Sequence, residues 1–264
     1  MAVEAIDFGG RTAWRKQYEP AGERRLRLAM LAALMRRLGI GALLPPPHRC
    51  GAEACAIELR RLRELDAIGV RVPELIAADD AALVLGDLGR TFASRLRAAA
   101  GDDDATDALV QRVVDAIAEV HARSGYLGQP SPRNVAIDDH GRVGFLDFEE
   151  DPLAVMSLDE AQARDWLMFA FGVARYYDGR EDALVALLAP ALKNGPAGVV
   201  REARSVGRLR WPARALRWLG RSARQVAHSV LVVHAATTLP VLAVAVLLAD
   251  WLHDGDLDLL RALL

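Results

Sequence analysis

Short runs in which apolar and polar residues alternate open the chain, and an unbroken apolar run lies near residue 80. Val3–Phe8 and Thr12–Tyr18 have the two-residue period of β-strands and are joined by Gly9-Gly10-Arg11, which predicts an antiparallel hairpin. Ala82–Leu85 is uninterrupted by polar residues and predicts a buried strand. We therefore expect a small sheet in the first third of the chain.

Longer segments carry apolar residues at steps of three and four, the spacing that places them on one face of a helix. The segments with this pattern are Arg24–Leu38, Glu53–Ile68, Asp102–Arg123 and Ser157–Tyr177. Gly69 follows the second segment as a helix-ending residue, and Ser157 with Glu160 predicts a capping box at the start of the fourth. Gly39–His48, with three consecutive prolines, predicts a connecting loop.

A second predicted hairpin lies in the middle of the chain. Asn134–Ile137 and Val143–Leu146 are short apolar runs on either side of a polar turn that contains Gly141. An amide, Asn134, begins the first run and a carboxylate, Asp147, follows the second, so the hairpin brings both to the same end. Paired oxygen ligands of this kind suit a hard divalent cation that binds phosphates. The alternative is that both residues only delimit the hairpin.

Composition and charge narrow the class of protein. At 264 residues the chain is long enough for one large domain or two smaller units with a substantial core. A formal net charge of −2 argues against a nucleic-acid partner. Cys50 and Cys55 offer neither a metal-ligand spacing nor a disulfide framework, which fits a reducing cytoplasm. The first residues lack a basic region followed by an apolar core, so no signal peptide is predicted.

The last sixty residues differ from the rest of the chain. Arg201–Arg224 contains eight arginines and one glutamate, mostly at helical spacing, and predicts a membrane-surface helix broken at Pro212. In Gln225–Ala249, eighteen of twenty-five residues are apolar and none is charged, a length that crosses about 30 Å of hydrocarbon. We predict contact with the cytoplasmic face of the inner membrane. The alternatives are a solvated arginine face and buried helices interrupted at Pro240.

The central hairpin resembles the catalytic hairpin of the protein-kinase-like superfamily, especially small bacterial members related to lipopolysaccharide kinases and aminoglycoside phosphotransferases. The pattern of that superfamily is His-Gly-Asp-Leu-x-x-x-Asn, a hairpin, and then Asp-Phe-Gly or Asp-Phe-Glu. Asn134 and the sequence Asp147-Phe148-Glu149 match it. The resemblance implies a Mg²⁺ site at Asn134 and Asp147, to which Glu149 adds a carboxylate. It also implies ATP as the second cofactor and a glycolipid or lipid-linked glycan as the acceptor.

The resemblance extends over roughly residues 3–185. Lys16 matches the strand lysine that binds nucleotide phosphates, and Glu58 matches its partner on the regulatory helix, with Glu64 as the weaker candidate. Leu85 and Asp87 lie where the hinge that contacts adenine is expected. A kinase normally has two strands and a Gly-rich loop before its lysine, whereas only fifteen residues precede Lys16, so the phosphate-covering lid is predicted to be shortened.

One mismatch lies at the centre of the pattern. The position that holds the base Asp in the superfamily is Gln129, and an amide accepts a hydrogen bond but cannot take a proton at neutral pH. Three interpretations stay open. The protein is an unusual kinase, one of Glu149, Glu150 and Asp151 supplies the missing carboxylate, or the site binds nucleotide or nothing without transfer.

Two further residues have counterparts in the resembled families. His121, near the end of its predicted helix, matches a histidine that precedes the catalytic loop, although a satisfied helix-end histidine is the simpler interpretation. Asp165 matches a buried aspartate that braces the backbone of the catalytic loop, with a surface carboxylate as the alternative.

The prediction as a whole is a two-lobed, protein-kinase-like α+β fold. Residues 1–86 form the N-lobe, 87–200 the C-lobe, and 201–264 a basic and apolar membrane-associated extension. The predicted function is an ATP- and Mg²⁺-dependent phosphotransferase. The alternatives are a pseudokinase that binds nucleotide or a partner, and an all-helical membrane-associated scaffold, which requires both hairpins to be misassigned.

Overall fold

The computed structural model describes residues 2–19, 32–33, 35–47, 49–205 and 231–237. Within them the chain forms an α+β fold with a four-stranded antiparallel sheet in the order β1-β2-β4-β3. The strands are β1 (Ala2–Phe8), β2 (Arg11–Gln17), β3 (Leu75–Asp79) and β4 (Ala82–Gly86). The opening hairpin and the strand at 82–85 are thus confirmed, whereas β3 was not predicted from the sequence.

Helix α2 (Gly51–Ala67) accompanies the sheet and contacts β4. It ends as predicted, with Gly69 at a φ of 74°, a left-handed conformation that glycine adopts at little cost. Its inner face combines apolar residues such as Leu62 and Leu65 with the carboxylate of Glu58, which is 1% exposed. Helix α2 therefore places the buried carboxylate of Glu58 on the side that faces the sheet.

The larger part of the molecule is formed by α-helices and short 3-10 helices. They are η1 (Gly41–Leu43), α3 (Phe92–Ala98), α4 (Asp103–Ala122), η2 (Pro152–Ala154), α5 (Leu158–Val173), η3 (Ala174–Tyr176), α6 (Glu181–Asn194) and α7 (Ala197–Ser205). The helices predicted at 53–68, 102–123 and 157–177 are confirmed, and Ser157 and Glu160 form the predicted capping box. Residues 32–33 and 35–38 are helical, while most of the helix predicted at 24–38 lies outside the described residues.

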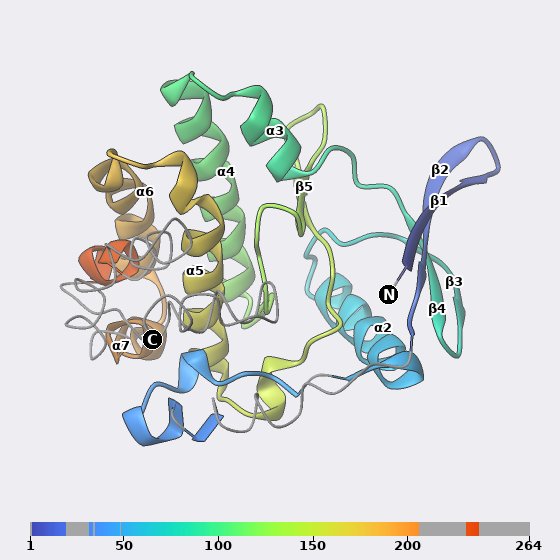
Figure 1. Cartoon of the computed structure of the whole chain (residues 1–264), viewed down its shortest axis with the longest axis horizontal. Coiled ribbons are helices and arrows are strands. Elements are labelled where there is room, and N and C mark those ends of the chain that lie inside the picture. Colours follow the sequence, from blue (N-terminus) through green and yellow to red (C-terminus); the bar gives the residue numbers. More distant parts are fainter. Residues whose placement is uncertain (1, 20–31, 34, 48, 206–230, 238–264) are drawn as a thin grey trace, which may run out of the picture.

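The sheet and α2 lie on one side of the molecule and α3 to α7 on the other (Figure 1). The short hairpin of β5 (Val135–Ile137) and β6 (Val143–Phe145) is located between them, and its two strands pair antiparallel, as expected of the predicted hairpin. Its strands are largely buried, and β5 contacts α3. The hairpin therefore lies between the sheet with α2 on one side and the helices α3 to α7 on the other.

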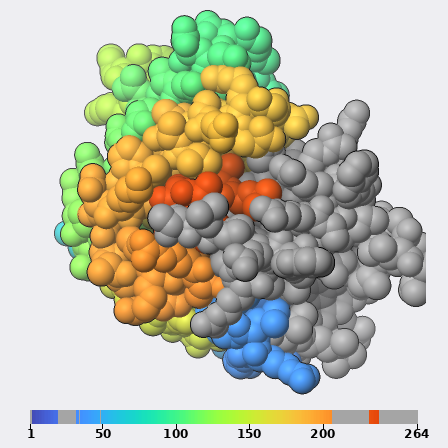
Figure 2. Space-filling view, turned by 90° about the vertical axis from the view of Figure 1, so that its left-hand side faces the viewer, coloured from blue at the N-terminus to red at the C-terminus, as the bar shows by residue number. Residues whose placement is uncertain are grey.

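The described fragment 231–237 bears on the C-terminal predictions. It is helical, and Val232, Val233 and Ala236 are buried in the main core. Arg204 Nε of α7 donates to the Thr237 carbonyl at 2.8 Å, and Figure 2 shows the fragment (red) beside the orange residues of α7. For these seven residues the structure agrees with the buried-helix alternative.

The rest of the two predicted segments, residues 206–230 and 238–249, lies outside the described part of the chain. Among the residues that are described, no helix combines the length and apolar character needed to cross a membrane. Membrane contact therefore stays a prediction from the sequence.

Candidate functional site

The β5–β6 hairpin brings Asn134 and Asp147 to one end, as predicted. The Leu146 amide donates to the Asn134 carbonyl at 2.8 Å, which fixes the two segments side by side. Asp147 has a φ of 68°, a left-handed conformation that is uncommon for residues with a side chain, although aspartate is among those that tolerate it. Such conformations concentrate at functional sites, and this one lies two residues after the end of β6.

A buried lysine joins three segments that are far apart in the sequence. Lys16 of β2 is 5% exposed, and its Nζ lies 2.5 Å from Glu58 Oε2 and 2.6 Å from Asp147 Oδ1. Burial alone would lower the pKa of Lys16, but the two carboxylates outweigh it and hold the pKa above its ordinary value. Lys16 is thus a permanent cation between α2 and the hairpin.

The predicted partner of Lys16 is confirmed as Glu58. Glu64 instead pairs with Arg60 and Arg61 at 2.7 and 3.0 Å on the outer side of α2. The hydroxyl of Tyr18 donates to Glu58 Oε2 at 2.6 Å, a contact not predicted from the sequence. Burial and the negative charge of Glu58 raise the pKa of Tyr18, so this hydroxyl remains a hydrogen-bond donor.

Carboxylate oxygens gather beside the lysine. One oxygen each from Glu58, Asp147 and Glu149 lies within 4.8 Å of the others. Burial and the adjacent Asp147 raise the pKa of Glu149, as expected where negative charges crowd together without enough counter-charge. An all-oxygen donor set of this type fits a hard divalent cation such as Mg²⁺. The structure thus brings the predicted ligands Asp147 and Glu149 together and adds Glu58.

The third predicted ligand, Asn134, is directed at the loop that precedes the hairpin. Its Nδ2 donates to the Gln129 carbonyl at 3.1 Å, and its side chain is buried. Asn134 therefore fixes the backbone at the position where the superfamily pattern has its base. The Gln129 side chain in turn donates through Nε2 to Glu150 Oε2 at 2.9 Å.

A buried aspartate braces the same loop from α5. Asp165 is 0% exposed and accepts from the amides of Leu127 and Gly128 at 2.7 and 2.6 Å. Its Oδ2 also lies 3.0 Å from His121 Nε2, and the His121 ring packs edge-on against Trp166. The predicted bracing role is confirmed, and His121 is a buried helix-end histidine whose partner is Asp165.

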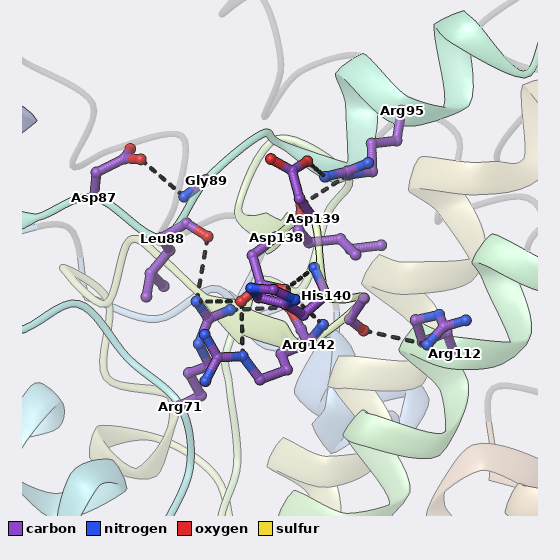
Figure 3. Close-up of polar contacts among 12 residues, drawn as sticks. Arg71, Asp87, Leu88, Gly89, Arg95, Arg112, Asp138, Asp139, His140 and Arg142 are labelled. Carbon is purple, nitrogen blue, oxygen red and sulfur yellow. Dashed lines mark hydrogen bonds and ion pairs between the residues drawn. The ribbon is translucent and has the colours of Figure 1, made fainter.

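The predicted hinge residues are engaged in contacts that stabilise the segment after β4. Asp87 accepts from Trp14 Nε1 at 2.8 Å and from the Gly89 amide at 3.0 Å, the second of which is visible in Figure 3. Leu85 is buried in β4 opposite Trp14. Neither residue makes a described contact with Lys16 or Asp147, so their predicted role in binding nucleotide stays a prediction.

The turn of the β5–β6 hairpin is anchored by arginines that were not singled out in the sequence (Figure 3). Asp138 accepts from the amides of His140 and Arg142 and from Arg142 Nε, and it pairs with Arg71 at 3.1 Å. Arg71 also donates to the carbonyls of Leu88 and Arg142. The hairpin is thus tied to the segment that leaves the sheet.

This anchor predicts a pH dependence of folding stability. Partial desolvation raises the pKa of Asp138, but hydrogen bonds from Arg142 and His140 outweigh it and lower the pKa to about 2. A carboxyl whose pKa is depressed on folding stabilises the protein above its unfolded pKa of ~4, and that contribution is lost as pH falls toward 2. In urea unfolding, wild type should therefore exceed Asp138→Asn in stability near neutral pH, and the difference should shrink in acid. A pH-independent difference would contradict this.

No protein-family model and no curated protein matches this sequence. The functional assignment consequently depends on the geometry of the Lys16 site and on the motifs that form it.

Proposed function

We propose that the protein is an ATP- and Mg²⁺-dependent phosphotransferase with a two-lobed, protein-kinase-like fold. The observation that supports this most strongly is the convergence of Lys16, Glu58 and Asp147 at 2.5 and 2.6 Å. These residues come from a strand, a helix and a hairpin in the order that the superfamily resemblance implies. Chance pairing of surface charges does not explain a triad whose lysine and glutamate are 5% and 1% exposed.

Each residue of the site has a role in this proposal. Lys16 would bind the nucleotide phosphates, and Glu58, held by Tyr18, would orient it. Asp147 and Asn134 would hold Mg²⁺, with Glu149 as a further carboxylate nearby. When bound, the metal neutralises charge on the phosphoryl group being transferred. The segment from Leu85 to Asp87 would lie against adenine, between an N-lobe of residues 1–86 and a C-lobe of residues 87–200.

The proposed acceptor is a hydroxyl group of a lipid-linked or cell-envelope glycan at the cytoplasmic face of the inner membrane. Its support is the resemblance to lipopolysaccharide kinases and the basic composition of Arg201–Arg224. No nucleic-acid partner is proposed, since the net charge of −2 offers no general attraction for phosphate backbones.

A specific observation favours a second candidate, a pseudokinase that binds nucleotide without transferring phosphate. Gln129 occupies the base position, and its amide, which donates to Glu150 through Nε2, cannot take a proton at neutral pH. The two candidates make the same prediction for nucleotide binding and differ in turnover.

Thermal unfolding of the full chain with ATP, in the presence and absence of Mg²⁺, tests the shared prediction. A ligand at one hundred times its dissociation constant stabilises the native state by about 2.7 kcal/mol, and we expect a rise in unfolding temperature that requires both ATP and Mg²⁺. Absence of any Mg²⁺-dependent rise would contradict both the phosphotransferase and the nucleotide-binding pseudokinase. Release of phosphate from ATP then separates the two.

A further inference from the structure

The three carboxylates that follow Asp147 and Phe148 lie in different environments, and only one of them is beside Gln129. Glu149 belongs to the cluster with Glu58 and Asp147, within 4.8 Å of both. Asp151 accepts from Tyr126 Oη at 2.7 Å and from Arg60 at 2.6 Å, and also from the Leu153 amide. Glu149 is therefore committed to the cluster around Lys16, and Asp151 to bonds with α2 and the loop.

Glu150 is the remaining carboxylate, and its contacts leave one oxygen available. Its Oε2 accepts from Gln129 Nε2 at 2.9 Å and lies 3.5 Å from Arg164. Within the described residues, Oε1 makes no hydrogen bond, and the side chain is 26% exposed. Arg164 is 2% exposed and its Nε has no partner among the described residues. A buried guanidinium and an amide thus hold Glu150 from one side and leave the other side open.

The geometry points to Glu150 as the residue that replaces the missing base, an inference that rests on the proposed phosphotransferase function. In this assignment Oε1 of Glu150 accepts a hydrogen bond from the acceptor hydroxyl. The hydroxyl oxygen forms a new bond to the γ-phosphorus of ATP, and the bond from that phosphorus to the β,γ-bridging oxygen breaks. The bridging oxygen leaves with the electron pair as ADP. The hydroxyl proton passes to Glu150 and from there to water.

Gln129 and Arg164 act as positioning residues in this arrangement. A carboxylate oxygen only accepts hydrogen bonds, so the group that faces it must donate, and Gln129 does so through Nε2. A second carboxylate at position 129 would place two negative charges about 3 Å apart, a pairing that prevents both from being ionised. Glutamine at the superfamily base position therefore complements Glu150. Asn134 and Asp165 fix the backbone on which Gln129 lies.

An exchange of the two side chains tests the assignment. We would measure phosphate release from ATP, with water as the acceptor, for wild type, Glu150→Gln, and the isosteric exchange Gln129→Glu/Glu150→Gln. General-base groups contribute about 100- to 10,000-fold, so Glu150→Gln should lose at least about 100-fold in turnover while its Mg²⁺-ATP unfolding shift stays that of wild type. The exchange variant keeps the amide–carboxylate pair, so its turnover should be at least about tenfold higher than that of Glu150→Gln. Glu119→Gln, 71% exposed on α4, is the matched control and should equal wild type.

The outcomes separate failure of this inference from failure of the proposed function. If Glu150→Gln turned over ATP as fast as wild type, the role of Glu150 would be overturned and the nucleotide site left intact. The same would follow if the exchange variant were as inactive as Glu150→Gln. A Mg²⁺-ATP shift without turnover in wild type would also overturn it and support the pseudokinase. If Mg²⁺-ATP did not raise the unfolding temperature of wild type, the proposed function would be contradicted, and this inference with it.

Discussion

Replacement of Asp147 by asparagine is expected to abolish the stabilisation of the protein by Mg²⁺-ATP. Asp147 is the carboxylate that the hairpin places against Lys16 at 2.6 Å, and an amide is a much weaker ligand for a hard cation. At one hundred times the wild-type dissociation constant, the stabilisation should fall from about 2.7 kcal/mol to near zero. The variant should still fold without ligand, because Lys16 keeps Glu58 as its ion-pair partner. Thermal unfolding with and without Mg²⁺-ATP measures both quantities.

Asp178→Asn is the control for this variant, because Asp178 is exposed and makes no described side-chain contact. It should keep the full Mg²⁺-ATP shift. If Asp147→Asn retained a shift equal to that of the control, the metal would not be held at Asp147, and the roles assigned to the hairpin would be wrong.

Replacement of Asp165 by asparagine should cause a large loss of folding stability. The carboxylate is 0% exposed and faces the amides of Leu127 and Gly128 and the ring of His121. An asparagine side chain turns one acceptor into a donor, so at least one buried donor loses its partner at about 1–3 kcal/mol each. Because the charge of the acceptor is also lost, we expect a total of roughly 3–5 kcal/mol. Urea unfolding measures it.

The same control, Asp178→Asn, should change the free energy of unfolding by less than about 0.5 kcal/mol, as is usual for exposed substitutions. Hydrogen exchange provides a second measure, since the amides of Leu127 and Gly128 should lose protection in Asp165→Asn. A loss below about 1 kcal/mol, with these amides still protected, would contradict the bracing role.

The sequence was most informative where local pattern and long-range order agree. The helices at 51–67, 103–122 and 158–173 follow from apolar periodicity and capping residues, which are local signals. Lys16 and its partner Glu58 are 42 residues apart in the sequence. Only the order of motifs in the resembled superfamily indicated that they pair. The structure contains that pair and places Asp165 beneath the loop, where it accepts from two loop amides.

Other features had no usable signal in the sequence. Strand β3 reads Leu-Ile-Ala-Ala-Asp, a composition without strand-like alternation, and it forms because β4 offers an edge to pair with. The contacts of Arg71 with Asp138 and of Arg164 with Glu150 join segments distant in the sequence. In a chain with 33 lysines and arginines, charge alone cannot select one partner. Among Glu149, Glu150 and Asp151, only the fold distinguishes their environments.

The proposed site is tested most directly by a crystal structure of the full chain with Mn²⁺ in place of Mg²⁺ and a non-hydrolysable ATP analogue. Anomalous scattering locates the metal independently of the protein. We predict Mn²⁺ bound to Asp147, with nucleotide phosphates beside Lys16 and the adenine against the segment that follows β4. A nucleotide bound elsewhere, or Lys16 still paired with Asp147 and no metal nearby at saturating ligand, would contradict the proposed function.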